Sequence, residues 1–392
     1  MSDISLPAAS AQTKTRIPWI DVARGAAMIA IVLGHTLLEG DIHTYLFSFH
    51  VPLFFVLSGL VFHVRSGETF LEFLARKAKA LLIPYFFFGL TVWLIFIFLG
   101  NVAASRLGLQ LASDSPLDYL IKGLLYGNGR DGFLKFNEPL WFLPALFVAE
   151  CALYGLNKLL DLIPKRGRMV AFAGFTAISL IIFWLFNGIQ EQGVMPLPFS
   201  AECAVSLLPF MICGWWFGSY FKTRMQKTAL PAEDTNSHQP AQDAEDSQPR
   251  NPSFTFALAL AAFALIAGGW TLSLTNRVVD YKTSLYGDIG IFFAAAVLSI
   301  VGWLLICYLI YENPLLEYIG KNTMSILCIH KLPILACQIA PTPLKELLAA
   351  QNLVAGLAVT AFAIAVSLGV GYILQKIYPP LVGKPAKSRR TF

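Results

Sequence analysis

The sequence predicts an all-α protein, a polytopic transmembrane bundle of about ten helices with both termini in the cytoplasm. Of its 392 residues, 56% are hydrophobic and only 14% are charged, whereas a soluble domain carries about 25% charged residues. Long apolar runs alternate with short segments that hold most of the charge. This pattern is typical of helices in lipid joined by loops in water, and it excludes a soluble fold.

Ten apolar runs are long enough to cross a bilayer, since a spanning helix needs about twenty residues. The helices are expected near residues 17–38, 45–64, 80–100, 138–162, 169–187, 200–221, 253–275, 287–311, 322–340 and 351–378. Residues 1–16 are polar, and the run that follows is long and carries charged side chains. No cleaved signal peptide is therefore expected.

The Lys and Arg residues of the connecting segments predict the orientation of the bundle. With a cytoplasmic N-terminus, the inside segments hold 18 of these residues and the outside segments hold 7, the bias that the positive-inside rule describes. The predicted organisation is a cytoplasmic tail (1–16), six helices (17–227), a polar, Pro-rich and disordered cytoplasmic linker (228–252), four helices (253–378) and a basic cytoplasmic tail (379–392).

The first predicted helix carries ionisable groups on one face. Asp21, Arg24, Met28, Ile31 and His35 recur at spacings of three and four, so they share a stripe. Arg24 and His35 are separated by about 16 Å of helix rise, which puts a cation near the cytoplasm and an imidazole deep toward the outer side. Charged groups inside a span are expensive and indicate function. The alternatives are an interfacial Asp21–Arg24 salt bridge and a structural hydrogen bond by His35.

The second predicted helix contains the segment FSFHVPLFFVLSG. Pro52 has no backbone N–H and is expected to break or kink the helix. His50 lies beside that point, where it either caps a freed carbonyl or lines a substrate site. Ser58 and Gly59 provide a small patch where a backbone or a ligand can approach closely.

A basic cluster, Arg76, Lys77 and Lys79, precedes the third predicted helix at the cytoplasmic side. It either anchors the helix at the membrane surface or provides Arg76 and Lys79 to bind the phosphates of a cytoplasmic cofactor.

The fourth and ninth predicted helices carry further polar groups. Trp141 lies one turn inside the fourth helix, and Glu150 lies near the middle of the bilayer, where a carboxylate needs a partner or a proton. His330 and Lys331 lie well inside the ninth helix. Trp141, Glu150 and His330 are therefore candidates for the same polar, substrate-binding cavity as His50 and Ser58.

Two classes of site are not expected. The six cysteines all lie in apolar runs, and none forms a CxxC pair or a metal-ligand spacing, so neither a metal nor a disulfide is predicted. The basic residues collect at membrane edges and form no aromatic-studded patch, so a nucleic-acid partner is not predicted either.

The motifs resemble those of a known family, the membrane-bound acyltransferase family 3, and most closely its fucose 4-O-acetylase-like branch. The resemblance rests on Arg24-x10-His35 with IDVARG, FSFHVPLFFVLSG, RKAKALLIPYF, PLWFLPALF and GKNTMSILCIH, which follow one another in the family's order between residue 17 and about residue 378. It implies a ten-helix bundle that takes an acyl group from cytoplasmic acyl-CoA. The acyl group is delivered to a hydroxyl of a carbohydrate or lipid-linked glycan, commonly outside the bacterial inner membrane.

The resemblance also implies roles for individual residues. His35 falls on the family's essential histidine, Arg24 on its paired arginine, and Arg76 on the basic residue before the third helix. Many relatives have an acidic residue five positions after the Trp of the fourth helix, but here Leu146 stands at that distance from Trp141. Glu150 lies one turn further on, so the resemblance assigns it no role.

Chemistry leads to the same expectation. Acyl transfer from a thioester to an alcohol needs a base and a group that stabilises the oxyanion, and imidazole has the best-matched pKa for that base near neutral pH. The chain has no Gly-x-Ser-x-Gly elbow and no Cys–His pairing, which favours direct transfer over an acyl-enzyme. Together with what the resemblance implies, the expected protein is an O-acetyltransferase of the inner membrane, surrounded by lipid, with acetyl-CoA as the donor and His35 and Arg24 as catalytic residues.

Two other functions remain open at this level. A transporter or flippase for a polar solute would also use broken helices with intramembrane His, Lys and Glu, but its halves should show inverted repeats, and none is evident. A sensor or assembly factor without catalytic activity is the third interpretation.

Overall fold

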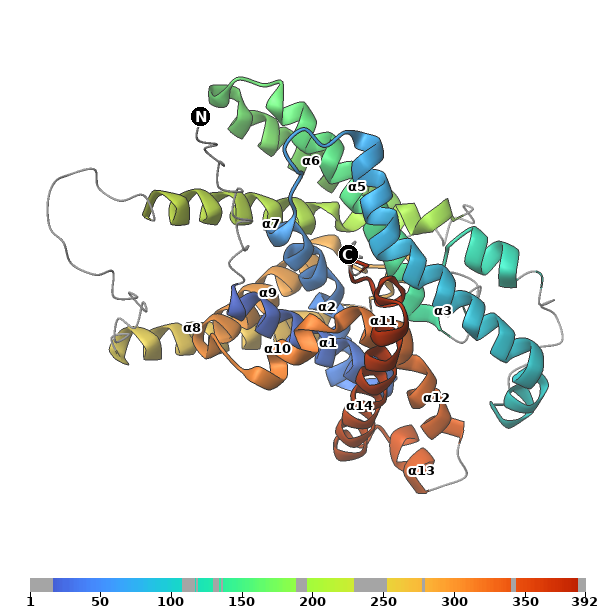
Figure 1. Ribbon diagram of the computed structural model, residues 1–392. Coiled ribbons are helices and arrows are strands. Elements are labelled where there is room, and N and C mark those ends of the chain that lie inside the picture. The colour runs from blue at the N-terminus through green and yellow to red at the C-terminus, as the bar shows by residue number, and fades with distance from the viewer. Residues whose placement is uncertain are drawn as a thin grey trace, which may run out of the picture.

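The computed structural model describes residues 17–107, 117, 119–129, 134, 137–187, 196–228, 252–276, 279–339 and 343–386. Nine long helices lie in these ranges (Figure 1): α1 (Pro18–Thr36), α2 (Gly40–Val61), α3 (Phe70–Leu107), α5 (Phe142–Asp161), α6 (Arg168–Phe186), α7 (Ala201–Thr228), α8 (Pro252–Thr275), α9 (Ile289–Ile310) and α14 (Leu353–Ile377). No strand occurs among the described residues. The predicted all-α fold is therefore confirmed.

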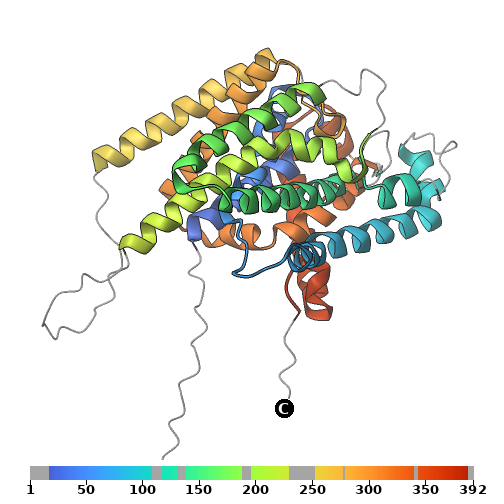
Figure 2. The same ribbon diagram turned by 90° about the horizontal axis from the view of Figure 1, so that it is seen from above.

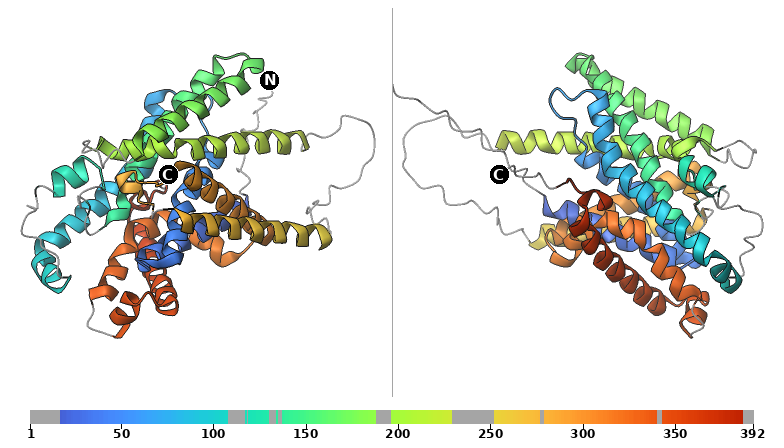
Figure 3. Two further views of the ribbon diagram at one scale, coloured as in Figure 1. Left: turned by 180° about the vertical axis from the view of Figure 1, so that it is seen from behind. Right: turned by 45° about the vertical axis from the view of Figure 1, so that its right-hand side comes forward.

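Short helices connect and extend the long ones. They are α10 (Pro314–Lys321), α11 (Thr323–Ile329), α12 (Lys331–Ile339) and α13 (Pro343–Ala349), with the one-turn or two-turn elements η1 (Tyr119–Leu125), η3 (Glu138–Trp141), η4 (Lys165–Gly167), η5 (Pro198–Ser200), η6 (Tyr281–Thr283) and η7 (Pro379–Val382). Both views of Figure 3 show α12, α13 and α14 together at one corner of the bundle.

Eight described helices are long and apolar enough to cross a membrane: α2, α3, α5 with η3, α6, α7 with η5, α8, α9 and α14. The segment Thr323–Ile339, bent by 111° against α13, would make a ninth candidate. The remaining predicted helix, the first one at residues 17–38, is α1, whose 19 residues include Asp21, Arg24 and His35. Most of α1 is buried, as a polar helix inside a membrane protein must be.

The long helices differ in how much of their surface is buried by the rest of the protein. Within their apolar windows, α2 and α5 are each 72% buried, whereas α6 is 11% and α8 is 17% buried. An apolar helix that is exposed on nearly every side requires lipid as its solvent. Figure 2 shows α8 at one edge of the bundle and α3 at the opposite edge. Helices α2 and α5 therefore lie inside the bundle, whereas α6 and α8 present most of their surface to lipid.

Helices α2 and α7 pack with their backbones almost in contact. A Cβ atom added to Gly59 would meet the carbonyl oxygen of Met211, and one added to Gly214 would meet that of Val56. Small residues allow this close approach, which provides much of the packing energy between helices in lipid. The Ser58-Gly59 patch of the sequence is thus in part a helix-packing site.

One predicted helix boundary is wrong, and two other predicted helices differ in detail from the structure. Helix α3 begins at Phe70 and not near residue 80, so the basic cluster lies within the helix. The start was missed because the first turns of α3 are amphipathic and do not form an apolar run. Helix α2 is one helix from Gly40 to Val61 with Pro52 inside it, so the break that Pro52 was expected to cause is not seen. The ninth predicted helix, 322–340, corresponds to the apolar segment Thr323–Ile339, within which α11 is followed by α12 at His330.

The predicted tails and linker lie largely outside the described residues. This holds for residues 1–16, for 229–251 of the linker and for 387–392 of the C-terminal tail. The described start of that tail forms η7. Lys384 follows it, and its Nζ donates hydrogen bonds to Asn322 (2.9 Å) and Gln375 (2.7 Å).

Candidate functional site

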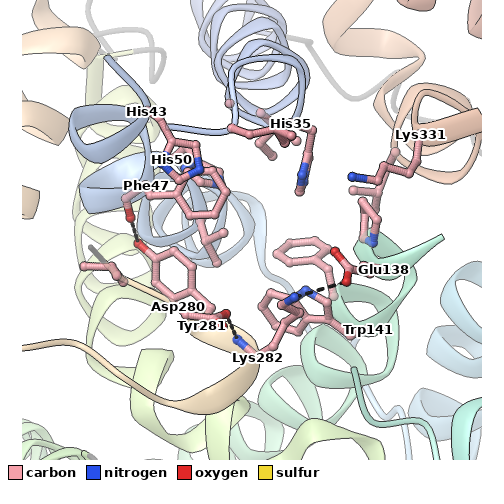
Figure 4. A pocket seen from close by; sticks show the side chains of 18 residues that line it. His35, His43, Phe47, His50, Glu138, Trp141, Asp280, Tyr281, Lys282 and Lys331 are labelled. Atoms are coloured by element: carbon pink, nitrogen blue, oxygen red, sulfur yellow. Dashed lines mark hydrogen bonds and ion pairs between the residues drawn. The ribbon is translucent and has the colours of Figure 1, made fainter. Parts of the chain in front are cut away.

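A cavity of about 270 Å³ lies at the end of the bundle that the charge bias predicts to face outward. Five segments of the chain contribute to its lining. It is lined by the end of α1, the first half of α2, η3 with the start of α5, the loop between α8 and α9, and the α11–α12 segment. Its polar and aromatic lining residues, drawn in Figure 4, are His35, His43, Phe47, His50, Glu138, Trp141, Phe142, Asp280, Tyr281, Lys282 and Lys331.

His35 occupies the last turn of α1 and lines this cavity. The centroid of its ring lies 6.0 Å from that of Phe47, which meets it edge to face, and 5.3 Å from that of His330. Figure 4 shows the imidazole pointing from α1 into the space above Trp141. The ring is therefore in position to exchange a proton with a molecule in the cavity.

His50 both lines the cavity and bonds to its own helix. Its Nδ1 hydrogen bonds to the carbonyl oxygen of Leu46 one turn earlier. The sequence left capping of a carbonyl freed by Pro52 and lining of the site as alternatives; His50 lines the cavity, and the carbonyl that it bonds is not the one that Pro52 frees. Pro52 cannot donate to the carbonyl of Ser48, and the adjacent carbonyl of Phe47 accepts a hydrogen bond from the Tyr281 hydroxyl (2.6 Å).

The loop between α8 and α9 forms one wall of the cavity. An isolated antiparallel bridge joins Asp280 to Leu285, and the Asp280 carboxylate accepts a hydrogen bond from the backbone N–H of Lys282 (3.0 Å). Burial raises the pKa of Tyr281 well above its ordinary value, so this phenol stays protonated as the donor to Phe47. The hydrogen bond from Tyr281 to Phe47 ties the loop to α2.

Two asparagines support this loop from behind. The side chain of Asn187, after α6, donates to the carbonyl of Gly287 (3.0 Å) and accepts from the N–H of Tyr286 (3.1 Å). Asn276, after α8, donates to the carbonyl of Tyr286 (2.9 Å) and accepts from the N–H of Asp288 (2.9 Å). Sequence analysis missed the loop as a site element, because a short external segment has neither periodicity nor a recognisable motif.

The charged groups of the cavity come from three separate segments. Lys282 pairs with Glu138 of η3 across 3.3 Å between Nζ and Oε1, and both side chains are about 30% exposed. Lys331 of α12 lines the same space. With Asp280, the cavity holds two ammonium groups and two carboxylates. It is polar with balanced charge, and Phe47, Trp141 and Phe142 provide its aromatic surface.

Arg24 lies toward the other end of the bundle, the one that the charge bias predicts to be cytoplasmic, called the inner end below. Its guanidinium lies 3.7 Å from the carboxylate of Asp21, the ion pair that the sequence suggested. Helix α10 crosses α1 at this point, since a Cβ on Gly25 would meet the carbonyl of Leu316 and one on Gly320 would meet that of Asp21. The Gly of IDVARG is therefore needed for this crossing.

Arg76 and Lys79 also lie toward the inner end, on α3. Arg76 binds Glu68 in a bidentate pair, with Nε to Oε1 at 2.7 Å and Nη2 to Oε2 at 2.8 Å. The hydrogen bonds from Arg76 lower the pKa of Glu68 to about 2. Lys79 is exposed. Arg76 is thus held in one orientation, while Lys79 is accessible.

Three predicted substrate-binding residues do not line the cavity. Ser58 is half-buried in α2, toward its inner end. Glu150 of α5 pairs with Lys77 of α3 across 2.6 Å, which identifies its partner among the options left open. His330 is fully buried and lies behind His35. Trp141 and His50, by contrast, are lining residues.

The comparison with protein families agrees with this arrangement. A model of the acyltransferase domain of acyltransferase family 3 matches residues 17–375. No curated protein and no solved structure matches the chain. The family match extends over all of the long helices and includes the His35 cavity as well as the Arg24 end. The chain therefore belongs to acyltransferase family 3 and is a multi-pass membrane acyltransferase.

Proposed function

We propose that this acyltransferase is an O-acetyltransferase of the bacterial inner membrane, of the fucose 4-O-acetylase-like kind. It transfers the acetyl group of cytoplasmic acetyl-CoA to a hydroxyl of a carbohydrate or lipid-linked glycan at the outer face. One observation carries the proposal: His35 lines a cavity of about 270 Å³ at the end of the bundle opposite Arg24. An imidazole in such a cavity is a suitable general base for a hydroxyl group.

The lining of the cavity supports a sugar as the acceptor. Sugars present apolar C–H faces and a ring of hydroxyl groups. Trp141, Phe142 and Phe47 supply flat apolar surface. The Glu138–Lys282 pair supplies both an acceptor and donors for hydroxyl groups. Both members remain partly exposed, so a bound hydroxyl can reach them.

The donor is expected to approach from the cytoplasmic end. Arg24 and Lys79, and Arg76 if it leaves Glu68, supply cations for the phosphates of CoA. About 16 Å of helix rise separates Arg24 from His35, a distance that the extended pantetheine arm of CoA can bridge. The thioester would then meet the acceptor beside His35.

The reaction needs no covalent enzyme intermediate. His35 takes the proton of the acceptor hydroxyl while the acceptor oxygen bonds to the acyl carbon. The resulting tetrahedral oxyanion collapses and breaks the carbon–sulfur bond, and the imidazolium returns its proton to the thiolate of CoA. The products are the acetyl ester and free CoA, and His35 is neutral again.

Lys331 is the cation best placed for the oxyanion in this scheme. It lines the cavity with His35, and no ion pair engages it among the described residues. A fixed positive charge beside a developing negative charge is often the largest single contribution to catalysis. Lys282 is less available, because Glu138 already neutralises it.

The test is acetyl transfer in membranes that contain the wild-type protein or His35→Ala. Membranes are incubated with acetyl-CoA carrying a radioactive acetyl group, and label is counted in the glycan and lipid fractions. Label is expected with the wild type and a loss of at least about a hundredfold with His35→Ala, the contribution of a general base. Equal labelling by a folded His35→Ala variant, or none by the wild type in the native membrane, would overturn the proposal.

A further inference from the structure

His330 has a defined tautomer in this structure. Its Nδ1 lies 2.8 Å from the carbonyl oxygen of Ile326 on the preceding turn. A carbonyl oxygen can only accept a hydrogen bond, so Nδ1 carries the proton and donates it. In a neutral imidazole the other nitrogen, Nε2, then has a free lone pair.

This second nitrogen is buried without a partner. The side chain of His330 is fully buried, and Nε2 has no hydrogen-bond partner among the described residues. A buried acceptor that is left unpaired destabilises the folded protein, and such an atom in a native structure calls for a functional explanation.

The nearest ring partner of that imidazole is His35. The two ring centroids lie 5.3 Å apart, with an angle of 38° between the ring planes. Two imidazole rings joined by one hydrogen bond of about 2.9 Å lie at a similar separation. Catalytic hydrogen bonds are often long or misaligned before substrate binds and tighten in the complex.

The segment that carries His330 is itself held in place. The backbone N–H of His330 donates to the carbonyl of Ile326 (3.0 Å), and its own carbonyl accepts from Ile334 (3.3 Å). Two residues earlier, the carbonyl of Cys328 accepts a hydrogen bond from the buried side chain of Asn137 (2.8 Å), just before η3. The imidazole of His330 is thereby fixed relative to the cavity wall that carries Glu138 and Trp141.

We propose that His330 is a positioning residue for the catalytic base, a role that rests on the proposed function of His35. Nε2 of His330 accepts the N–H of His35 and so fixes the tautomer in which the unprotonated nitrogen of His35 faces the acceptor hydroxyl. When His35 takes the substrate proton, both of its nitrogens become donors, and the same hydrogen bond stabilises the imidazolium.

Two substitutions separate this role from simple packing. In His330→Asn the amide nitrogen replaces Nδ1, so donation to Ile326 is kept and the acceptor at Nε2 is lost. In His330→Gln the amide oxygen replaces Nε2, so the acceptor is kept and donation to Ile326 is lost. A packing role predicts that Asn is the better replacement, whereas the positioning role predicts that Gln is.

The experiment measures kcat and the acceptor KM for both variants, per amount of monodisperse purified protein, together with their thermal unfolding. We expect His330→Asn to lower kcat at least about tenfold with little change in KM, out of the roughly 10²- to 10⁴-fold that a general base contributes. His330→Gln should keep most of kcat although its melting temperature is the lower of the two.

A double-mutant cycle with His35→Ala adds an independent readout. If His330 acts through His35, the loss caused by His330→Asn disappears when His35 is already absent. The inference would be overturned if the two variants had equal kcat values or if His330→Gln lowered kcat more than His330→Asn does. It would also be overturned if His330→Asn lowered kcat as much in the absence of His35 as in its presence. An inactive wild type would instead reject the proposed function, so the two failures are distinguishable.

Discussion

The ammonium of Lys77 on α3 lies 2.6 Å from the carboxylate of Glu150 on α5, and both side chains are largely buried. The rings of Phe62 and Phe73 lie within 6 Å of the Lys77 nitrogen and complete its surroundings. Glu150 thus has a partner in the membrane, and that partner comes from the basic cluster suggested for cofactor binding. The pair joins two helices beneath the cavity.

The stability of the protein should depend strongly on having both members of the Lys77–Glu150 pair, or neither. Glu150→Leu or Lys77→Met should each destabilise the protein by about 3–5 kcal/mol, because each leaves a buried charge unpaired. The double variant should recover most of that loss. Thermal unfolding in detergent measures these changes.

The pair Lys321–Glu317 on α10, also at 2.6 Å but with side chains 35% and 18% exposed, is the matched control. Glu317→Leu should cost no more than about 1 kcal/mol. A double Lys77→Met, Glu150→Leu variant as unstable as the single variants would mean that the carboxylate or the ammonium has another essential contact.

The close packing of α2 and α7 predicts that one added methyl group between them lowers the stability of the fold. Gly214→Ala should destabilise the fold by about 1–3 kcal/mol, since the new Cβ meets the backbone of α2. Gly369→Ala in α14, where nothing lies within 4 Å of the added atom, should change stability by less than about 0.5 kcal/mol. Melting temperatures of the two variants test this, and equal effects would contradict the close approach of α2 and α7.

Tyr281 predicts a change in acceptor affinity. Tyr281→Phe removes the hydrogen bond that ties the cavity loop to Phe47. The lost hydrogen bond should cost about 1–3 kcal/mol, divided between the free energy of unfolding and the free energy of acceptor binding. The acceptor KM should rise while kcat changes little, because the loop shapes the cavity without touching the reacting atoms. Tyr318→Phe, on an exposed side chain of α10, is the control and should leave KM unchanged.

Donor binding by the inner arginines predicts a separate change in KM. Arg24→Ala and Arg76→Ala should raise the KM for acetyl-CoA more than they lower kcat, because a phosphate contact acts on ground state and transition state alike. Lysine at either position should restore part of the affinity. Glu68→Gln distinguishes this role from anchoring: a phosphate ligand at Arg76 predicts a normal KM in that variant, whereas equal defects in Glu68→Gln and Arg76→Ala would show that only the ion pair matters.

The same pair predicts a pH dependence of stability. The folded pKa of Glu68, about 2, lies below its ordinary value of 4.5, so its stabilising contribution is complete above the ordinary value and is lost as the pH falls toward 2. The difference in melting temperature between wild type and Glu68→Gln should therefore be constant above about pH 6 and shrink below about pH 4.5. A difference that does not change with pH would contradict the assignment.

Several features of this protein were accessible from the sequence because they depend on local pattern. Apolar runs of about twenty residues locate most of the spanning helices, since the bilayer leaves no other way to satisfy the backbone. The spacing of Arg24 and His35 places them on one stripe of α1 at opposite ends, as the structure has them. The start of α3 at Phe70 and the change of helix at His330 were missed, because amphipathic turns and a short helix change leave little mark on hydropathy.

Only the tertiary structure decided which polar groups meet. Lys77 and Glu150 are 73 residues apart, and the Tyr281 hydroxyl reaches Phe47 across 234 residues. Such contacts depend on how helices cross and how loops fold back, and neither leaves a local signal in the chain. The charge and length of a segment determine whether it enters the membrane, whereas packing against its neighbours determines that His35 faces a cavity with His330 behind it.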